Sequence, residues 1–485
     1  MRDYLIFTLL LSANCSFVLI HRAQIGRIPY GNSVRSNKCY GGITTTVNNL
    51  RHSKAKNHAK IEKGRELRWE KKCIEALIWL VKQKSYEQRS KKRKQDFTRK
   101  RKMAFNEIIY FMLGMVKEST QNALERAFPQ LKKENLYMSQ QAFSAARQKI
   151  KWEAFEELFR TSVAGSYQEQ WETWRGYRVM AVDGSFIRLP SDTELVEYYG
   201  GLGHGQTAAT ALASLLYDLV NNIVAGAKIA PVSENERALA EEHLSVLQGM
   251  AGCNRGHREL VIFDRGYPSR EFVKSLSDKE IAYVIRVPKG FIREGELKRA
   301  KEGRVSLGKT GLQVRAVRIP LTTGEQEILI TNLTKAEMEY EAFGELYHKR
   351  WGIETKYKEL KQKLETENFS GRLVDNVKQD FYAVMTVANM LASLVREANR
   401  KAKKKRERSG NRYEYQVNVN HAVGVFKDQV IRVIIEEDRI VRRYLMREMV
   451  RRMERRVVPV RPNREVIRKD CHRKGKFHHN HKSNC

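Results

Sequence analysis

The spacing of apolar residues changes along this chain, and that change limits the folds it can adopt. Between residues 103 and 165 apolar residues recur every three or four positions, which predicts helices. From about residue 176 they gather into short runs bounded by Asp, Gly, Asn and Pro, which predicts strands. Helical patterns return at 233–247, 334–371 and 374–400. A chain that mixes these segments is expected to form an α/β fold.

The charge of the chain is its most prominent global feature. Among 485 residues there are 90 Lys and Arg but 56 Asp and Glu, a formal net charge of +34 at pH 7. A protein this basic binds polyanions through counterion release, and nucleic acid is the usual partner. A generic basic surface is the alternative. Hydrophobic residues make up 41% of the chain, which excludes wholesale disorder and allows a substantial core.

The two ends of the chain carry ambiguous signals. The apolar run from Tyr4 to Ile20 is similar to the core of a signal peptide, but Arg2 and Asp3 cancel in its flank and polar residues interrupt it. We interpret residues 1–50 as a leader upstream of the functional start. The six cysteines lack paired spacing, which indicates reduced thiols, and the Cys/His-rich tail lacks compact zinc-site spacing. We expect a cytoplasmic, nucleoid-associated protein without a membrane domain.

Three carboxylates stand at positions suited to a metal site. Asp183 and Asp264 each follow an apolar strand, and Glu354 lies in the middle of a predicted helix. Carboxylate oxygens are ligands that Mg²⁺ prefers, and two such ions can activate an attacking hydroxyl and stabilise the leaving oxygen of a phosphodiester. Taken singly, Asp183 and Asp264 are also ordinary turn residues. Glu354 alone is explained by ion pairs with basic residues four positions away.

The segment "LYHKRWGIETKYKELK" places different chemistries on one helix face. At about 100° of rotation per residue, Tyr347, Arg350, Glu354 and Lys361 share a narrow stripe. We predict that Glu354 is a metal ligand and that Arg350 and Lys361 bind DNA phosphates beside it. Tyr347 would orient the strand or pack against it. A solvated basic face is the alternative for the two cations.

Three segments, taken in order, carry a family resemblance. "AVDGS", "FDRGYPSREF" and "YHKRWGIETKYKELK" resemble the three catalytic motifs of the DDE transposases. They are most similar to insertion-sequence family four, whose signature is Tyr-x₂-Arg-x₃-Glu-x₆-Lys. Tyr347, Arg350, Glu354 and Lys361 meet that signature in full. With "AFSAARQKI" and "QDFYAVMTVANML", the resemblance extends over residues 90–400, approximately.

The resemblance implies a domain organisation. It predicts an RNase H-like catalytic core at residues 170–400, a mixed sheet flanked by helices, with a β-rich insertion at about 278–335. Residues 51–165 would form a basic helical DNA-binding domain, with Ser139 as a helix N-cap. Residues 401–485 would form a basic helical region and a disordered tail, separated from the core by a linker at 401–410.

The resemblance also implies an activity. The metal ligands would be Asp183, Asp264 and Glu354, holding Mg²⁺, for which Mn²⁺ substitutes at all-oxygen sites. The enzyme would bind double-stranded DNA at its terminal inverted repeats, cleave it, and join the 3′-OH ends to target DNA as a homodimer in a paired-end complex. Relatives often form a hairpin and flip a base onto a tryptophan of the insertion. None of the six tryptophans lies between residues 265 and 335, so the hairpin step stays open.

Two other functions are compatible with these residues. An RNase H-like nuclease would cut DNA without joining it, and the cations on the Glu354 helix argue for retained DNA ends instead. A domesticated or inactive transposase-derived protein would bind DNA without chemistry. The intact set of Asp183, Asp264 and Glu354 argues against that second alternative.

Overall fold

The structure of this protein is a computed structural model. It describes residues 71–114, 119–169, 171–202, 208–251, 257–292, 297, 300–308, 311–320, 326–406 and 413–460. The predicted leader at 1–50 and the Cys/His-rich tail lie outside these residues. No helix in the described part of the chain is long and apolar enough to cross a membrane.

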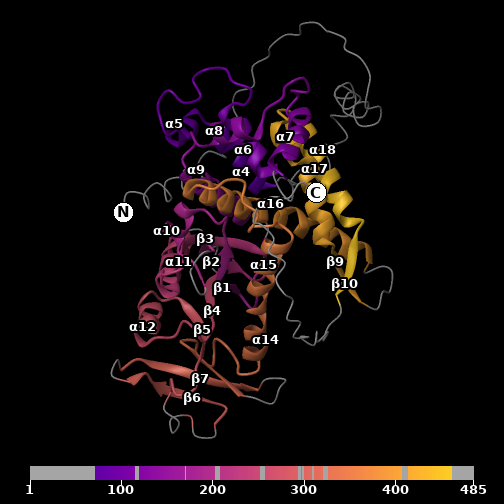
Figure 1. The fold of residues 1–485 in the computed structure, drawn as a ribbon. Helices are drawn as coiled ribbons and strands as arrows, with labels where there is room; N and C mark the ends of the chain where they lie inside the picture. The colour runs from indigo at the N-terminus through magenta and orange to yellow at the C-terminus, as the bar shows by residue number, and fades with distance from the viewer. Residues whose placement is uncertain are drawn as a thin grey trace, which may run out of the picture.

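A sheet of eight strands organises the fold (Figure 1). Its strands follow the order β3-β2-β1-β4-β5-β8-β7-β6. The first three are antiparallel neighbours, whereas β4 is parallel to both β1 and β5. This mixed order is the RNase H-like arrangement, which confirms the predicted α/β fold and its core. The strands are β1 (Tyr177–Arg188), β2 (Thr210–Asp218), β3 (Ile223–Pro231), β4 (Arg258–Phe263), β5 (Ala282–Val287), β6 (Glu302–Ser306), β7 (Gln313–Pro320) and β8 (Gln326–Thr331).

The region predicted to be a β-rich insertion is built from β5 to β8. Strand β5 pairs with β4 and therefore belongs to the core. Strands β8, β7 and β6 continue the same sheet as an antiparallel extension. Figure 1 shows β6 and β7 at the end of the molecule opposite the N-terminal helices. The extra strands thus lengthen the catalytic sheet and do not form a separate one.

The prediction that Asp183 follows a strand is wrong, and no turn forms at Asp183-Gly184-Ser185. All three residues lie inside β1, and the pairing with β2 runs without interruption through Asp183↔Leu215 and Gly184↔Ser214. Asp-Gly favours turns through local backbone preferences. Here the continuous ladder with β2 overrides that preference, because strand propensity depends strongly on tertiary context.

The helix predicted at 334–371 is shorter and interrupted. Thr334 and Glu337 do exchange the two backbone hydrogen bonds of a capping box, at 2.9 and 3.3 Å, but they close only turns. The helices are α14 (Ala342–Lys349) and α15 (Trp351–Gln362). At the junction the Arg350 N–H donates to Tyr347 O at 3.1 Å, a bond over three residues that tightens the chain there.

Helices cover the sheet and gather at one end of the molecule (Figure 1). Ser139 caps α8 by accepting from Ala142 N–H at 3.3 Å, which confirms the predicted N-cap. A short sheet of β9 (Glu414–Val417) and β10 (Val457–Val460) joins the C-terminal helices and was not predicted. The helices outside the catalytic motifs are α4 (Lys72–Val81), α5 (Lys84–Ser90), α6 (Phe105–Gly114), α7 (Thr120–Gln130), α8 (Gln140–Arg147), α9 (Glu153–Tyr167), α10 (Thr193–Tyr199), α11 (Glu236–Ala251), α12 (Arg270–Asp278), α16 (Val374–Arg406), α17 (Val419–Ile435) and α18 (Arg439–Glu454).

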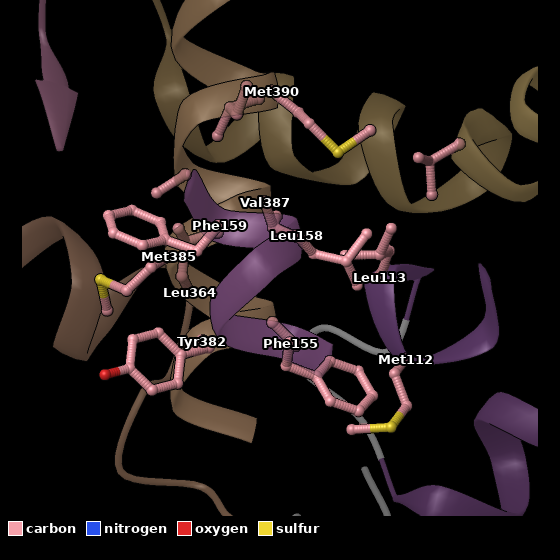
Figure 2. Packing of buried hydrophobic residues seen from close by; sticks show 14 of the residues in the cluster. Met112, Leu113, Phe155, Leu158, Phe159, Leu364, Tyr382, Met385, Val387 and Met390 are labelled. Carbon is pink, nitrogen blue, oxygen red and sulfur yellow. The ribbon is translucent and has the colours of Figure 1, made fainter. Parts of the chain in front are cut away.

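Helix α16 lies between the sheet and the N-terminal helices. Figure 2 shows its residues Tyr382 and Val387 packing among Phe155 and Leu158 of α9 and Leu113 of α6. One continuous cluster of buried side chains includes these residues, one face of the sheet and the C-terminal helices. The predicted division at residues 165 and 400 stays a prediction, and the core is continuous across both positions.

The linker predicted at 401–410 is wrong for its first six residues. Residues 401–406 continue α16. Ala402 is 3% exposed, and this buried side chain gives the basic segment an apolar contact that a solvated linker would lack. Residues 407–410 lie outside the described part of the chain.

Candidate active site

Asp183 and Asp264 meet where β4 ends and β1 continues. The register of these parallel strands ends at Ala181↔Ile262, so two residues further on Asp183 comes opposite Asp264. Burial raises the pKa of Asp183, and the charge of Asp264 contributes to the same rise. Strand topology therefore brings together the first two acids that the sequence predicted.

Asp183 is a partly buried acid on a well-anchored backbone. The Tyr357 hydroxyl of α15 donates to Asp183 O at 2.8 Å and to Ala213 O at 3.0 Å, which fixes α15 against β1 and β2. Burial raises the pKa of Asp183 to about 6, and the charges of Asp264 and Glu236 add to this effect. Arg350 opposes the shift. A cation beside this carboxylate would relieve the cost of its desolvation.

Asp264 is held by groups from three elements. Its Oδ1 accepts from the N–H of Arg265 at 2.7 Å and from the Tyr347 hydroxyl at 3.4 Å. Arg286 of β5 places Nη1 3.8 Å from the same oxygen and also pairs with Glu327. The contact with Tyr347 shows that one member of the predicted stripe reaches the acids directly. Arg286 was not predicted, because nothing in its local sequence distinguishes it from other strand cations.

Arg350 links the stripe on α15 to the acids. Its Nη2 donates to Glu354 Oε1 at 2.8 Å, the side chain is largely buried, and Nε has no hydrogen-bond partner among the described residues. Burial lowers the pKa of Arg350, but Asp264, Tyr347 and Glu354 outweigh it, so the pKa is raised overall. The ion-pair alternative for Glu354 is therefore present in the structure, with Arg350 as partner.

Lys361 lies apart from the three acids. Its Nζ donates to Phe186 O at 2.5 Å and is 3.5 Å from Glu367 Oε1. Phe186 follows Asp183 on β1, and its side chain is exposed. Lys361 thus lies beside β1 three residues beyond Asp183 and does not contact the acids.

The donor set fits a hydrated divalent ion. Within the described residues no three Asp, Glu, His or Cys side chains are placed to hold a metal together. Magnesium in phosphoryl-transfer sites needs only one or two carboxylates, because water and phosphate oxygens complete its octahedron. Asp183 and Asp264 supply two adjacent hard oxygen ligands. Glu354 would join them only after leaving Arg350.

Two further groups at this site were missed by sequence reasoning. Glu236 begins α11, where Asn235 Oδ1 accepts from Arg237 N–H at 2.9 Å. Tyr267 is buried near the acids, and its hydroxyl has no hydrogen-bond partner among the described residues. The position of Glu236, at the start of the helix that follows β3, is the sequence feature that could have indicated it.

Comparisons with known proteins identify similar sequences over the region that contains the site. Residues 174–390, which contain every candidate residue above, match a family model described as the transposase DDE domain. The chain is 24% identical over 318 residues to the transposase InsG for insertion sequence element IS4 of Escherichia coli (strain K12), covering 60% of this chain and 70% of that protein.

A solved structure of piggyBac transposase, in a synaptic complex with hairpin DNA, is a more remote match. It has a TM-score of 0.42 and 11% identity, covering 80% of this chain and 87% of that one. A likeness this distant carries no argument about the site.

Proposed function

We propose that this chain is a DDE transposase of the IS4 family, which binds its element's terminal inverted repeats, cleaves the DNA there and joins the 3′-OH ends to target DNA. The adjacency of Asp183 and Asp264 beside Arg350, inside the matched domain, is the observation that carries the proposal. The protein would act in the cytoplasm on nucleoid DNA.

Each acid has a proposed role in cleavage. Asp183 and Asp264 bind a divalent ion, Mg²⁺ or Mn²⁺, through one or both carboxylate oxygens. When bound, such an ion activates a water or a 3′-OH as nucleophile and stabilises the leaving oxygen, and a pair of ions does both at once. Glu354 completes the acidic set when it separates from Arg350. Tyr347 holds Asp264 in place through its hydroxyl.

The cations bind the DNA strand that the acids alone would repel. When Glu354 leaves Arg350, the guanidinium is free to bind a phosphate, and its buried Nε has no hydrogen-bond partner among the described residues. Lys361 binds a phosphate further along β1, where, within the described part of the chain, its Nζ contacts the Phe186 carbonyl and Glu367. Both roles agree with the positive charge of the chain.

The remaining helices supply recognition and assembly. The basic region at 51–165, whose described part starts at residue 71, recognises the element ends. Helices α17 and α18 support a homodimer that holds two ends together. The net charge of +34 supports DNA contact by these regions, since counterion release favours any extended basic surface on a duplex.

The test uses DNA that carries the flanks of the gene, labelled at one end and incubated with purified protein and Mg²⁺. Wild type should cut at a discrete flank position, and Glu354→Gln should not. Glu345→Gln is the matched control, because this exposed glutamate on α14 pairs with Lys349 outside the site. Its cleavage should equal that of wild type.

Other outcomes separate the alternatives. Binding without cleavage by wild type would favour the domesticated DNA-binding protein. Cleavage without joined product, when target DNA is added, would favour a nuclease. Cleavage that survives in Glu354→Gln would contradict the assignment of this acid.

A further inference from the structure

Glu236 comes close to strand β1, which carries Asp183, at Gly184, the single glycine of that strand. A Cβ added to Gly184 would lie 2.8 Å from Glu236 Oε1 and 3.0 Å from its Cδ, closer than real Cβ contacts come. Glycine inside a strand often marks a place where another group must come close. Gly184 therefore leaves room for a carboxylate beside Asp183, and any larger residue would displace it.

Glu236 and Asp183 reach the same edge of β1 from opposite faces of the sheet. Side chains alternate along a strand, so Gly184 shares a face with Val182, which packs in the core beneath α11. Asp183 points to the other face, where α15 lies against it. Because β4 no longer pairs with β1 beyond Ala181, side chains from both faces of the sheet can reach this edge of β1. The charge of Glu236 acts on Asp183 across it.

Tyr267 supplies an independent sign of a polar ligand. Its ring packs against Phe263, with centroids 5.4 Å apart, and only 2% of the residue is exposed. The hydroxyl has no hydrogen-bond partner within the described chain, which is uncommon for a buried group. After burial, the charges of Glu236, Asp183 and Asp264 act most strongly on it and raise its pKa. The hydroxyl therefore experiences the negative charge of all three carboxylates.

We propose that Glu236 is a fourth acidic group of the active site and that, with Tyr267, it binds the coordinated water of a divalent ion held by Asp183 and Asp264. This inference rests on the function proposed above. Glu236 acts through water, because no three acidic side chains of the described residues are placed to hold one ion directly. It is a positioning residue, since groups that bind a metal's water orient the inner ligands and tune the ion.

The test measures Mn²⁺ binding to the full chain without DNA, from the electron paramagnetic resonance signal of the free ion. Glu236→Gln should weaken binding about 10- to 100-fold, the usual range for outer-sphere partners. Gly184→Ala should weaken it in the same way, because the added methyl displaces the carboxylate. In the double variant the two losses should not add, since both remove one interaction.

Two variants separate this role from a structural one. Tyr267→Phe removes a hydroxyl for which the described residues offer no hydrogen-bond partner, so it should leave the thermal midpoint unchanged and still weaken Mn²⁺ binding. Glu242→Gln removes another carboxylate of α11, one that pairs with Lys228 at the surface. Its affinity for Mn²⁺ should match that of wild type.

Failure of this inference differs from failure of the proposed function. If Asp183→Asn abolishes Mn²⁺ binding and Glu236→Gln binds like wild type, the role of Glu236 is overturned and the metal site stands. If Asp183→Asn also binds like wild type, the metal site itself is overturned. A variant of Gly184 that fails to fold leaves Glu236→Gln and Tyr267→Phe to decide.

Discussion

Arg147 and Arg350 are both buried arginines that meet carboxylates, but they are bonded differently. Arg147, at the end of α8, donates from Nε to Gln379 at 2.9 Å and from Nη2 to Asn376 O and Asp380 at 3.0 Å each. Its Nη1 donates to Ser370. Every nitrogen is satisfied, three of the four partners lie on α16, and the side chain is 0% exposed.

Arg350 is less completely bonded. It donates to Glu354, leaves Nε without a partner among the described residues, and faces Asp264 as a charge. A buried charge with complete hydrogen bonds fixes two elements to each other. A buried charge with incomplete hydrogen bonds can still bind a ligand, but it lowers the stability of the protein. The difference distinguishes the contact between α8 and α16 from the candidate active site.

The largest effect should follow from breaking the satisfied network. Arg147→Met should lower the free energy of unfolding by about 3–5 kcal/mol, because it leaves Asp380 buried without its cation. Chemical denaturation measures this. Arg160→Met is the control, since its exposed pair with Glu156 contributes below about 0.5 kcal/mol. A loss under about 1 kcal/mol for Arg147→Met would remove the contrast.

His243, a second buried group with a hydrogen-bond partner, predicts that the protein loses stability in acid. Burial, with the charge of Lys228, lowers the pKa of His243 from 6.5 to about 3, and its Nε2 lies 3.1 Å from Ser214 Oγ. The unfolded chain binds this proton more readily, so the stability is complete above pH 6.5 and is lost as the pH falls toward 3. Between pH 7 and 5 the loss is about 2 kcal/mol.

This loss is measured by comparing wild type with His243→Gln. The variant cannot take up the proton, so its free energy of unfolding should fall less between pH 7 and 5. Equal slopes for the two proteins would contradict the assignment.

Asp183, in the candidate active site, predicts a dependence of stability on pH with the opposite sign to that of His243. Because burial raises the pKa of Asp183 to about 6, the folded state binds its proton more readily than the unfolded one. The stability from this group is present below about pH 3.8 and is lost as the pH rises through 6. Asp183→Asn should therefore stabilise the protein at pH 8 by about 1–2 kcal/mol, after allowance for partial exposure.

Calorimetric melting without divalent ions checks this prediction. Added Mn²⁺ should stabilise wild type and not the variant. Destabilisation by Asp183→Asn would show that its carboxylate is satisfied in the same way as Asp380.

The smallest effect should come from Arg350. Arg350→Gln should change the free energy of unfolding by about 1 kcal/mol or less, since Asp264 and Glu354 are about 30% exposed and water can solvate them. DNA cleavage should be lost in the same variant. A stability loss equal to that of Arg147→Met would remove the distinction between the two arginines.

The sequence by itself determined the helical and strand segments and the identity of the acids. Apolar periodicity is a local property, so the change to strands near residue 176 and the helix at 374–400 were predicted close to β1 and α16. The stripe from Tyr347 to Glu354 was also predictable, because helix geometry fixes which side chains share a face. The hydrogen bond between Arg350 and Glu354 agrees with this shared face, whereas the contact between Tyr347 and Asp264 was not predicted.

Tertiary structure decided what local preference could not. Gly184 stays in a strand because β2 pairs with it, and it is glycine where Glu236 comes close. Arg286 reaches Asp264 only because β5 pairs beside β4. These outcomes depend on contacts between distant segments, whose free energies exceed the turn and capping preferences of a few residues.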